Sequence, residues 1–305
     1  MSNHPMRIKP KGLLTSPPAS KEKPSRAGFF QKTAQAFTRF FHSTGQVLRS
    51  KTAVSLALCL CLACVSVLYA GGLKDESVTV LAHKRQLPVY SVARDDKVVA
   101  ISFDAAWGGT QTIPLLDILD EYNVKTTFFL VGFWVDKYPD LVKEIVARGH
   151  EIGNHSQSHP HMSQLSEEKI KEELRIMGDK VVKLTGVRPT LFRPPYGDYN
   201  DRVILASRAE GYEVIQWSVD SLDWKNRGTD DIIKQCTQNV QSGDIVLFHN
   251  DAQYILQALP EVLKRYQEMG FTIIPVSKIL LEGETTIDVQ GKQHPVVSPT
   301  PAPAR

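Results

Sequence analysis

Cysteine is scarce in this 305-residue chain, which contains only four. Cys59, Cys61 and Cys64 fall within one apolar run, and Cys236 stands alone in the rest of the sequence. A disulfide framework therefore cannot organise the larger part of the chain. Any domain there must be stabilised by a hydrophobic core instead.

Acidic residues are nearly absent from the N-terminal segment. Residues 1–52 contain ten Lys or Arg and one acid, Glu22, whereas the remainder contains 26 Lys or Arg and 32 Asp or Glu. The basic character of the chain thus belongs to its first segment, and the rest carries a net negative charge. Because a nucleic-acid-binding domain needs a basic face, the larger part of the chain is expected to bind no nucleic acid.

Charged residues are missing altogether from residues 52–73. A helix of that length is about 33 Å long, which is enough to cross a bilayer. Basic residues precede the segment, so the positive-inside rule predicts a cytoplasmic N-terminus and an extracytoplasmic main domain, hence a single-pass cell-membrane protein. The alternative is a cleaved signal peptide, although the preceding basic region is long and the sequence at its end is a poor cleavage motif.

On either side of residues 52–73, the composition divides the chain into four further segments. Residues 1–51 form a basic cytoplasmic segment that is expected to be largely disordered, because its Pro-, Ser- and Lys-rich first part shows no hydrophobic period. Residues 29–50 alternatively form a short basic amphipathic helix on a membrane surface. Residues 74–96 are expected to be a connector, residues 97–281 a folded domain, and residues 282–305 a loose tail.

The segment 97–281 alternates between strand and helix patterns. Short apolar, β-branched runs predict strands, and the apolar-periodic segments between them predict helices. This alternation is typical of an α/β fold with a parallel sheet and helices outside. The strands are expected near 98–103, 126–131, 150–152, 190–192, 213–217, 244–248 and 271–274, and the helices near 112–122, 139–148, 167–184, 200–209, 230–240 and 253–268.

Polar side chains follow five of these strands. The carboxyl ends of parallel strands meet at one edge of the sheet, where active sites form. We therefore expect these side chains to converge: Asp104, His155 with His159, Arg193, Asp223 and His249. His155 and His159 are four residues apart and would share one face if their segment were helical. Two imidazoles at that spacing suit a borderline metal such as Zn²⁺.

Together these motifs resemble the polysaccharide deacetylase family with the NodB homology domain, which is similar to carbohydrate esterase family 4. The resemblance covers about 60% of the chain, and it implies a distorted, incomplete (β/α) barrel, preceded here by one transmembrane helix. The motifs that carry it are S-F-D (102–104), H-S-Q-S-H (155–159), R-P-P-Y-G (193–197), D-S-L-D-W (220–224) and L-F-H (247–249).

The resemblance also implies roles for the acid and base residues. Asp104 matches the general base that deprotonates the attacking water, and Arg193 matches the residue that orients it. His249 matches the general acid that protonates the leaving amine, and Asp223 matches the acid that orients His249. An amine is a poor leaving group unless it is protonated, so such an acid is required.

Ligand positions follow from the same resemblance. His155 and His159 match two ligands of a divalent metal, which is expected to be Zn²⁺, with Co²⁺ or Mn²⁺ as alternatives. The backbone N–H of Tyr196 matches a donor to the oxyanion, Trp224 matches a wall of the pocket, and Leu247 belongs to the substrate site.

One position departs from the family pattern. The first motif of the family usually contains two acids, of which the second is a metal ligand, but this chain has Ala105 there. Three interpretations follow: Asp104 itself binds the metal, another group such as His161 or a water fills the gap, or the site holds metal poorly and has weak or no activity. The variant F-D-x-x-W-G resembles a branch associated with spore-forming bacteria.

The sequence therefore predicts a membrane-anchored hydrolase of carbon–nitrogen bonds other than peptide bonds. It is expected to remove N-acetyl groups from the amino sugars of peptidoglycan or chitin-like oligomers, with no obligate protein partner. Ala105 motivates a second hypothesis, a cell-wall-binding pseudoenzyme. A third is an amide hydrolase acting on a substrate other than a sugar.

Overall fold

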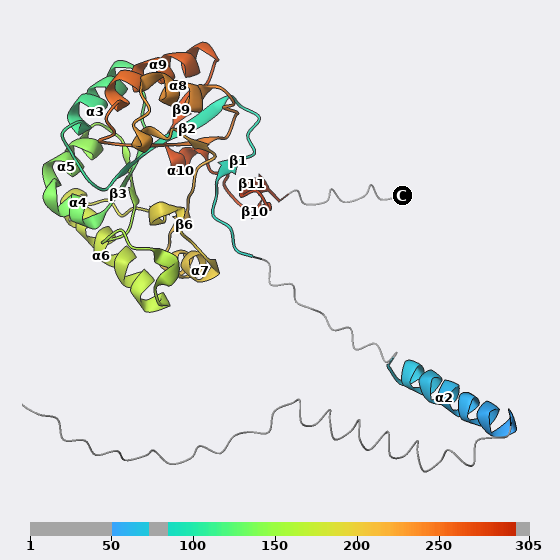
Figure 1. Ribbon diagram of the computed structural model, residues 1–305. Coiled ribbons are helices and arrows are strands. Elements are labelled where there is room, and N and C mark those ends of the chain that lie inside the picture. The colour runs from blue at the N-terminus through green and yellow to red at the C-terminus, as the bar shows by residue number, and fades with distance from the viewer. Residues whose placement is uncertain (1–50, 73–84, 297–305) are drawn as a thin grey trace, which may run out of the picture. The chain divides into compact units, whose positions relative to one another are not determined.

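The computed structural model describes residues 51–72 and 85–296, and within the first range it describes the side chains of residues 55–66. The chain divides into two compact units, residues 1–82 and residues 83–305 (Figure 1). The expected disordered or amphipathic segment before residue 51, residues 74–84 of the expected connector and the last nine residues lie outside the described residues.

Helix α2 covers Lys51–Gly72 in the first unit. Within the described residues, no helix combines the length and the apolar character needed to cross a membrane. The membrane span expected for residues 52–73 therefore stays a prediction from the sequence.

A curled parallel sheet forms the centre of the second unit. Its strands follow the order β6-β5-β4-β3-β2-β8-β7, and β9 pairs with β2 beside this path. Every pairing in the sheet is parallel. This is the architecture expected of an incomplete (β/α) barrel. The strands are β2 (Val98–Ala105), β3 (Thr127–Leu130), β4 (Glu151–Asn154), β5 (Leu191–Phe192), β6 (Glu213–Val214), β7 (Val219–Asp220), β8 (Ile245–His249) and β9 (Thr272–Ile274).

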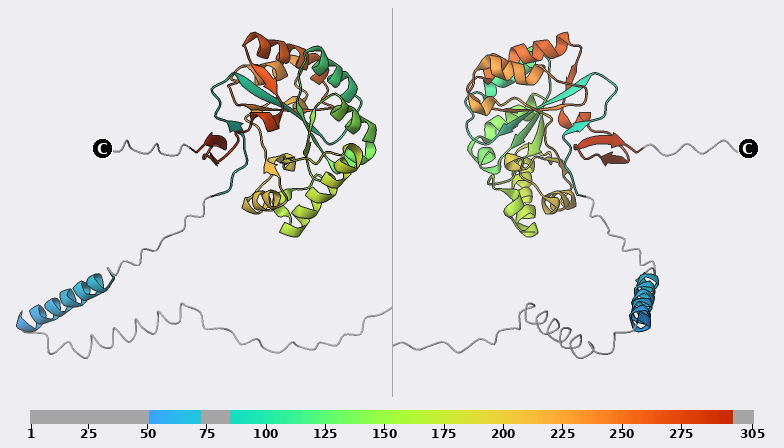
Figure 2. Two further views of the ribbon diagram at one scale, coloured as in Figure 1. Left: turned by 180° about the vertical axis from the view of Figure 1, so that it is seen from behind. Right: turned by 45° about the vertical axis from the view of Figure 1, so that its right-hand side comes forward.

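Helices surround this sheet on its outer side (Figure 2). The six expected helices are present, and their ends agree with the sequence pattern to within three residues. Ser166 caps α6, as its position before two acids predicts, by accepting a hydrogen bond from the Lys169 amide. The helices are α3 (Thr112–Glu121), α4 (Gly132–Lys137), α5 (Pro139–Ala147), α6 (Glu167–Thr185), α7 (Asp201–Ala209), α8 (Thr229–Thr237), α9 (Ile255–Glu268) and α10 (Val276–Ile279).

Three phenylalanines form an aromatic layer on one face of the neighbouring strands β3, β2 and β8. Phe103 pairs in register with Phe128 on β3 and with Phe248 on β8. Its ring stacks on theirs, with centroid distances of 5.0 and 5.7 Å. Each such pair contributes about 0.5–1.5 kcal/mol beyond the area it buries. The next residues in the same register are Asp104 and His249, whose side chains point to the opposite face of the sheet. The phenylalanine layer therefore stabilises the strand register that places these two side chains side by side.

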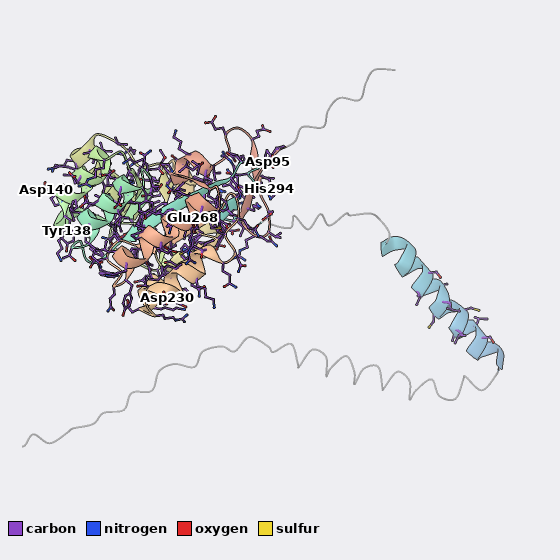
Figure 3. All side chains as sticks on the ribbon, turned by 90° about the horizontal axis from the view of Figure 1, so that it is seen from above. Asp95, Tyr138, Asp140, Asp230, Glu268 and His294 are labelled. Atoms are coloured by element: carbon purple, nitrogen blue, oxygen red, sulfur yellow. The ribbon has the colours of Figure 1, made fainter. Side chains whose placement is uncertain are left out.

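A second, smaller sheet joins the two ends of the domain. It contains β1 (Ser91–Val92), β10 (Thr285–Ile287) and β11 (Lys292–Pro295), in the order β1-β11-β10. Strand β1 pairs parallel to β11, and β10 and β11 form an antiparallel hairpin. Accordingly, Asp95 and His294 lie at the same edge of the domain (Figure 3).

This small sheet differs from two expectations. Residues 285–295 were expected within a loose tail and residues 91–92 within a connector, but both are strands. The strands are two to four residues long, which is too short for an alternating pattern to be recognised. They are stabilised by pairing between segments that are about 200 residues apart in the sequence.

Candidate active site

Side chains from five strand ends meet in one cavity of about 710 Å³. Asp104 and His249 stand opposite each other in register at the ends of β2 and β8. Seven of the predicted site residues line the cavity, while Arg193 and Asp223 are fully buried behind it. The seven are Asp104, His155, His159, Tyr196, Trp224, Leu247 and His249.

Arg193 forms a buried ion pair with Asp104. Its Nη1 donates to Asp104 Oδ1 at 2.8 Å, and its Nη2 donates to Ser102 Oγ at 2.8 Å and to the Gln216 carbonyl at 3.1 Å. The guanidinium also lies over the Phe129 ring, 4.1 Å from the centroid. A buried ion pair is stable only when additional hydrogen bonds satisfy its donors. These contacts give both terminal nitrogens of Arg193 a partner, whereas its buried Nε has none.

The ion pair keeps Asp104 charged. Burial by itself would raise the pKa of this carboxyl group, but the charge of Arg193, the neighbouring imidazoles of His155 and His249, and the hydrogen bond from Arg193 outweigh burial and lower the pKa. Asp104 is therefore an ionised carboxylate at neutral pH, as a proton acceptor must be. Ser102, for which the sequence predicts no role of its own, accepts a hydrogen bond from Arg193 and so helps to hold the guanidinium against Asp104.

His155 presents one nitrogen to the Asp104 carboxylate. Its Nδ1 lies 2.7 Å from the Arg193 carbonyl, and because a carbonyl only accepts, Nδ1 carries the proton and Nε2 has the lone pair. That Nε2 lies 3.5 Å from Asp104 Oδ2. Burial lowers the pKa of His155, so the imidazole is neutral.

The segment after β4 is an irregular loop and not a helix. Ser156 and His159 have positive φ values of 68° and 57°, and this backbone brings the rings of His155 and His159 to a centroid distance of 5.0 Å. His155 and His159 therefore do not share the face of a helix, as a helical segment would have required. Their two imidazoles come together through the loop instead. Burial lowers the pKa of His159 to about 4, and His159 Nδ1 is buried with no hydrogen-bond partner.

Glu173 on α6 holds this loop in place. Its carboxylate accepts from the amides of Gln157 and Ser158 at 2.9 and 2.7 Å, and from Ser158 Oγ at 2.7 Å. The sequence does not distinguish Glu173 from the other acids of α6, because all of them fall within one strongly charged helix. Only the packing of α6 beside the loop shows that it accepts three hydrogen bonds there.

The described residues do not provide a complete metal centre. Two imidazoles and one carboxylate lie near one another, yet no group of three or more His, Cys, Asp or Glu side chains in the described ranges is arranged to hold a metal ion. A zinc site takes at least three protein ligands. Ala105 is fully buried within the hydrophobic core and does not line the cavity.

His161 does not complete the ligand set either. Its ring stacks on Tyr196 with a centroid distance of 4.4 Å, and the His159 ring meets Tyr196 edge-on at a centroid distance of 4.5 Å. Both histidines thus contact the Tyr196 ring. Tyr196 itself has a φ of 60°, a conformation that non-glycine residues adopt at some cost.

Asp223 and His249 form the second ion pair of the site. Asp223 Oδ1 lies 2.7 Å from His249 Nδ1, and Asp223 Oδ2 accepts from the His249 amide at 2.7 Å. Burial would lower the pKa of His249, but the hydrogen bond and charge of Asp223, together with Asp104 and Asp220, raise it. The imidazolium is thereby favoured near neutral pH, as a general acid requires.

Comparison with known proteins agrees with this geometry. A family model described as polysaccharide deacetylase matches residues 91–215. A peptidoglycan-N-acetylglucosamine deacetylase of Bacillus cereus is 37% identical over 196 residues, which are 63% of this chain and 92% of that protein. A peptidoglycan-N-acetylmuramic acid deacetylase of Bacillus subtilis is 33% identical over 189 residues, 62% of this chain and 40% of that protein.

Two similar solved structures are forms of one protein that is named a pseudoenzyme. A CE4 family pseudoenzyme from Bacillus anthracis is 30% identical, with a TM-score of 0.61, and the match covers 63% of this chain and 68% of that one. A mutant of that protein with restored enzymatic activity is 31% identical, with a TM-score of 0.61, and the match covers 63% of this chain and 70% of that one. Similarity at this level therefore includes both active and inactive proteins.

Replacing Asp223 by Asn should lower the pKa of His249, because the neighbouring negative charge is removed while burial remains. The raised pKa also stabilises the wild-type fold: this contribution is fully present below the unfolded-state pKa of 6.5 and is lost as the pH rises through the folded-state value. NMR titration of the His249 ring would measure its pKa. Urea unfolding at several pH values would measure the pH dependence of the free energy of unfolding. Asp230→Asn, which changes an exposed acid on α8 (Figure 3), is the control; an unchanged His249 pKa in Asp223→Asn would contradict the assignment.

Proposed function

Since this chain belongs to the polysaccharide deacetylase family, we propose that it removes N-acetyl groups from the amino sugars of a cell-wall glycan. Removal of such a group is hydrolysis of a carbon–nitrogen bond other than a peptide bond. Both curated relatives described above are named as peptidoglycan deacetylases, which supports peptidoglycan as the substrate class. Membership of the branch associated with spore-forming bacteria stays a prediction from the first motif.

The observation that carries this proposal is the pairing of an ionised carboxylate with a protonated imidazole. Asp104 and His249 are direct neighbours across two strands, and their pKa values move in opposite directions, one lowered by Arg193 and the other raised by Asp223. Acid–base catalysis needs two titratable groups in one cavity whose pKa values are shifted in opposite directions.

The reaction can be written with the residues of this chain. Water gives a proton to the Asp104 carboxylate as its oxygen bonds to the acetyl carbon. The tetrahedral intermediate then collapses: its carbon–nitrogen bond breaks while His249 gives a proton to the departing nitrogen. The products are acetate and a free amine. We propose that the Tyr196 amide donates to the oxyanion, and that Trp224 and Leu247 contact the sugar.

Substitution of either catalytic group should abolish most of the acetate release. Asp104→Asn keeps an oxygen for Arg193 but removes the basic group, and His249→Gln removes the acid; each is expected to lower the rate by about 10²–10⁴-fold. Release of acetate from peptidoglycan and from N-acetylglucosamine oligomers by the full chain is the measurement, with His294→Gln in the distant hairpin as the control. Full activity in both variants would overturn the mechanism.

A second candidate function is glycan binding without turnover. Two observations favour it: Ala105 faces the core where the family usually has a metal-binding acid, and the solved Bacillus anthracis relative is named a pseudoenzyme. Asp104 with its lowered pKa is a weak base, so unactivated water is a difficult substrate for it. The same cavity would then bind the glycan and leave its acetyl groups in place.

Metal dependence separates the two functions. If the chain is a deacetylase, chelation should lower acetate release. Zn²⁺, Co²⁺ or Mn²⁺ should then restore it only at concentrations well above that of the protein, because two imidazoles without a third ligand bind metal weakly. Full restoration by one equivalent of metal would show that the ligand set is complete. Glycan binding with no acetate release under any of these conditions would establish the second function.

We also propose that residues 52–73 anchor the chain in the cell membrane, with the catalytic domain outside. The support is the uncharged length of this segment and the basic residues before it. The full chain should fractionate with membranes and resist extraction by high salt, whereas a variant with Leu60→Arg and Leu62→Arg should move to the soluble fraction. Leu205→Arg, which changes an exposed residue on α7, is the control, and a wild-type chain in the soluble fraction would disprove the anchor.

A further inference from the structure

A second cavity adjoins the first one. Its volume is about 330 Å³, and it lies between the end of β2 and helix α4. Ala106, Trp107 and Gly108 line both cavities, so these three residues form the wall between them. A volume of this size falls within the range of about 300–1,000 Å³ that is typical of small-ligand sites.

The wall is held rigidly from both sides. The Gly108 carbonyl accepts from Trp134 Nε1 at 2.8 Å on the side of the second cavity, and from Asn250 Nδ2 at 2.9 Å on the side of the first. The Trp107 ring contacts Phe133 at a centroid distance of 5.4 Å and His159 at 5.8 Å. A ring positioned in this way loses little freedom when a ligand binds to it.

Trp107 nevertheless exposes 68% of its surface. A large aromatic side chain that is held in place and still exposed, at the rim of a cavity, is typical of a binding surface. The apolar C–H face of a pyranose ring fits the electron-rich face of an indole. Trp107 is thus suited to contact a glycan chain that passes from one cavity into the other.

Lys137 gives the second cavity a positive charge. It ends α4 and lines the cavity, and its Nζ lies 5.1 Å from the centroid of the Tyr138 ring. The nearest acids in sequence are already paired, Asp136 with Lys180 and Asp140 with Lys143. Among the described residues, Lys137 has no carboxylate partner within ion-pair distance. Tyr138 and Asp140 mark this edge of the domain in Figure 3.

We propose that the second cavity binds a sugar residue that carries a carboxylate, next to the N-acetylated sugar in the first cavity. Trp107 would contact the glycan between the two sites, and Lys137 would pair with the carboxylate. This proposal rests on the proposed glycan substrate and deepens it, because it makes an alternating, anionic glycan the preferred ligand over a neutral one.

Calorimetric titration of the full chain in detergent tests the proposal. The probes are an N-acetylglucosamine tetramer, which is neutral, and a tetramer that alternates N-acetylglucosamine with N-acetylmuramic acid, which carries carboxylates. The wild-type chain should bind the anionic tetramer more tightly. Lys137→Gln should weaken binding of the anionic tetramer by about three- to tenfold and leave the neutral one unchanged. Lys264→Gln, which changes an exposed lysine on α9 outside the cavity, should change neither.

Trp107 is tested separately with the same probes. Trp107→Ala should weaken binding of both tetramers by about tenfold, and Trp107→Phe should restore part of the loss. Equal affinity of the wild-type chain for the two tetramers, or an unchanged anionic affinity in Lys137→Gln, would overturn the carboxylate site and leave the proposed function standing. Absence of binding to either tetramer would overturn both. Because binding is measured, the result does not depend on whether the chain turns substrate over.

Discussion

The buried ion pair between Asp104 and Arg193 is the interaction on which the site depends. It connects the end of β2 to the segment after β5, two strands that are separated by β3 and β4 in the sheet. Arg193 uses its guanidinium for Asp104 and its own carbonyl for His155. A single residue thus sets both the charge of the carboxylate and the tautomer of the neighbouring imidazole. Loss of one partner of such a pair leaves a buried charge, at a cost of about 3–5 kcal/mol.

The proposed acid and base of the site are close together, and their pKa values differ because the groups that surround them differ. The two proposed catalytic groups are adjacent in register, and the residues before them pack in one phenylalanine layer on the opposite face of the sheet. Their opposite pKa shifts arise from different partners, a guanidinium behind one and a carboxylate behind the other. Since each partner is fully buried, the shifts do not depend on the ionic strength of the solvent to the extent that surface pairs do.

Most of the fold could be predicted from the sequence, because strand and helix patterns alternate clearly and the polar residues follow the strands. Asp104 and His249 were recognisable at the ends of apolar runs, and their convergence follows from parallel pairing. Glu173 was not recognisable, since nothing in the spacing of an acid-rich helix indicates which carboxylate faces a loop. The strands β1, β10 and β11 were missed because they are only two to four residues long, and β1 also depends on a partner about 200 residues away. The metal expectation depended on the spacing of His155 and His159 and on the family pattern, and the core position of Ala105 is a property that only packing reveals.

The start of the domain also has a mechanical consequence. Before strand β1 begins, the Gln86 amide donates to Asp201 on α7, and Val89 bridges to Ile215 beside β6. A pull on the chain from residue 85 would therefore act on α7 and β6 before it reached the ladder between β1 and β11. Strand β6 is the last strand of the main sheet, with β5, β4 and β3 between it and β2. The force would thus enter the domain at the end of the sheet that is far from the register of Asp104 with His249.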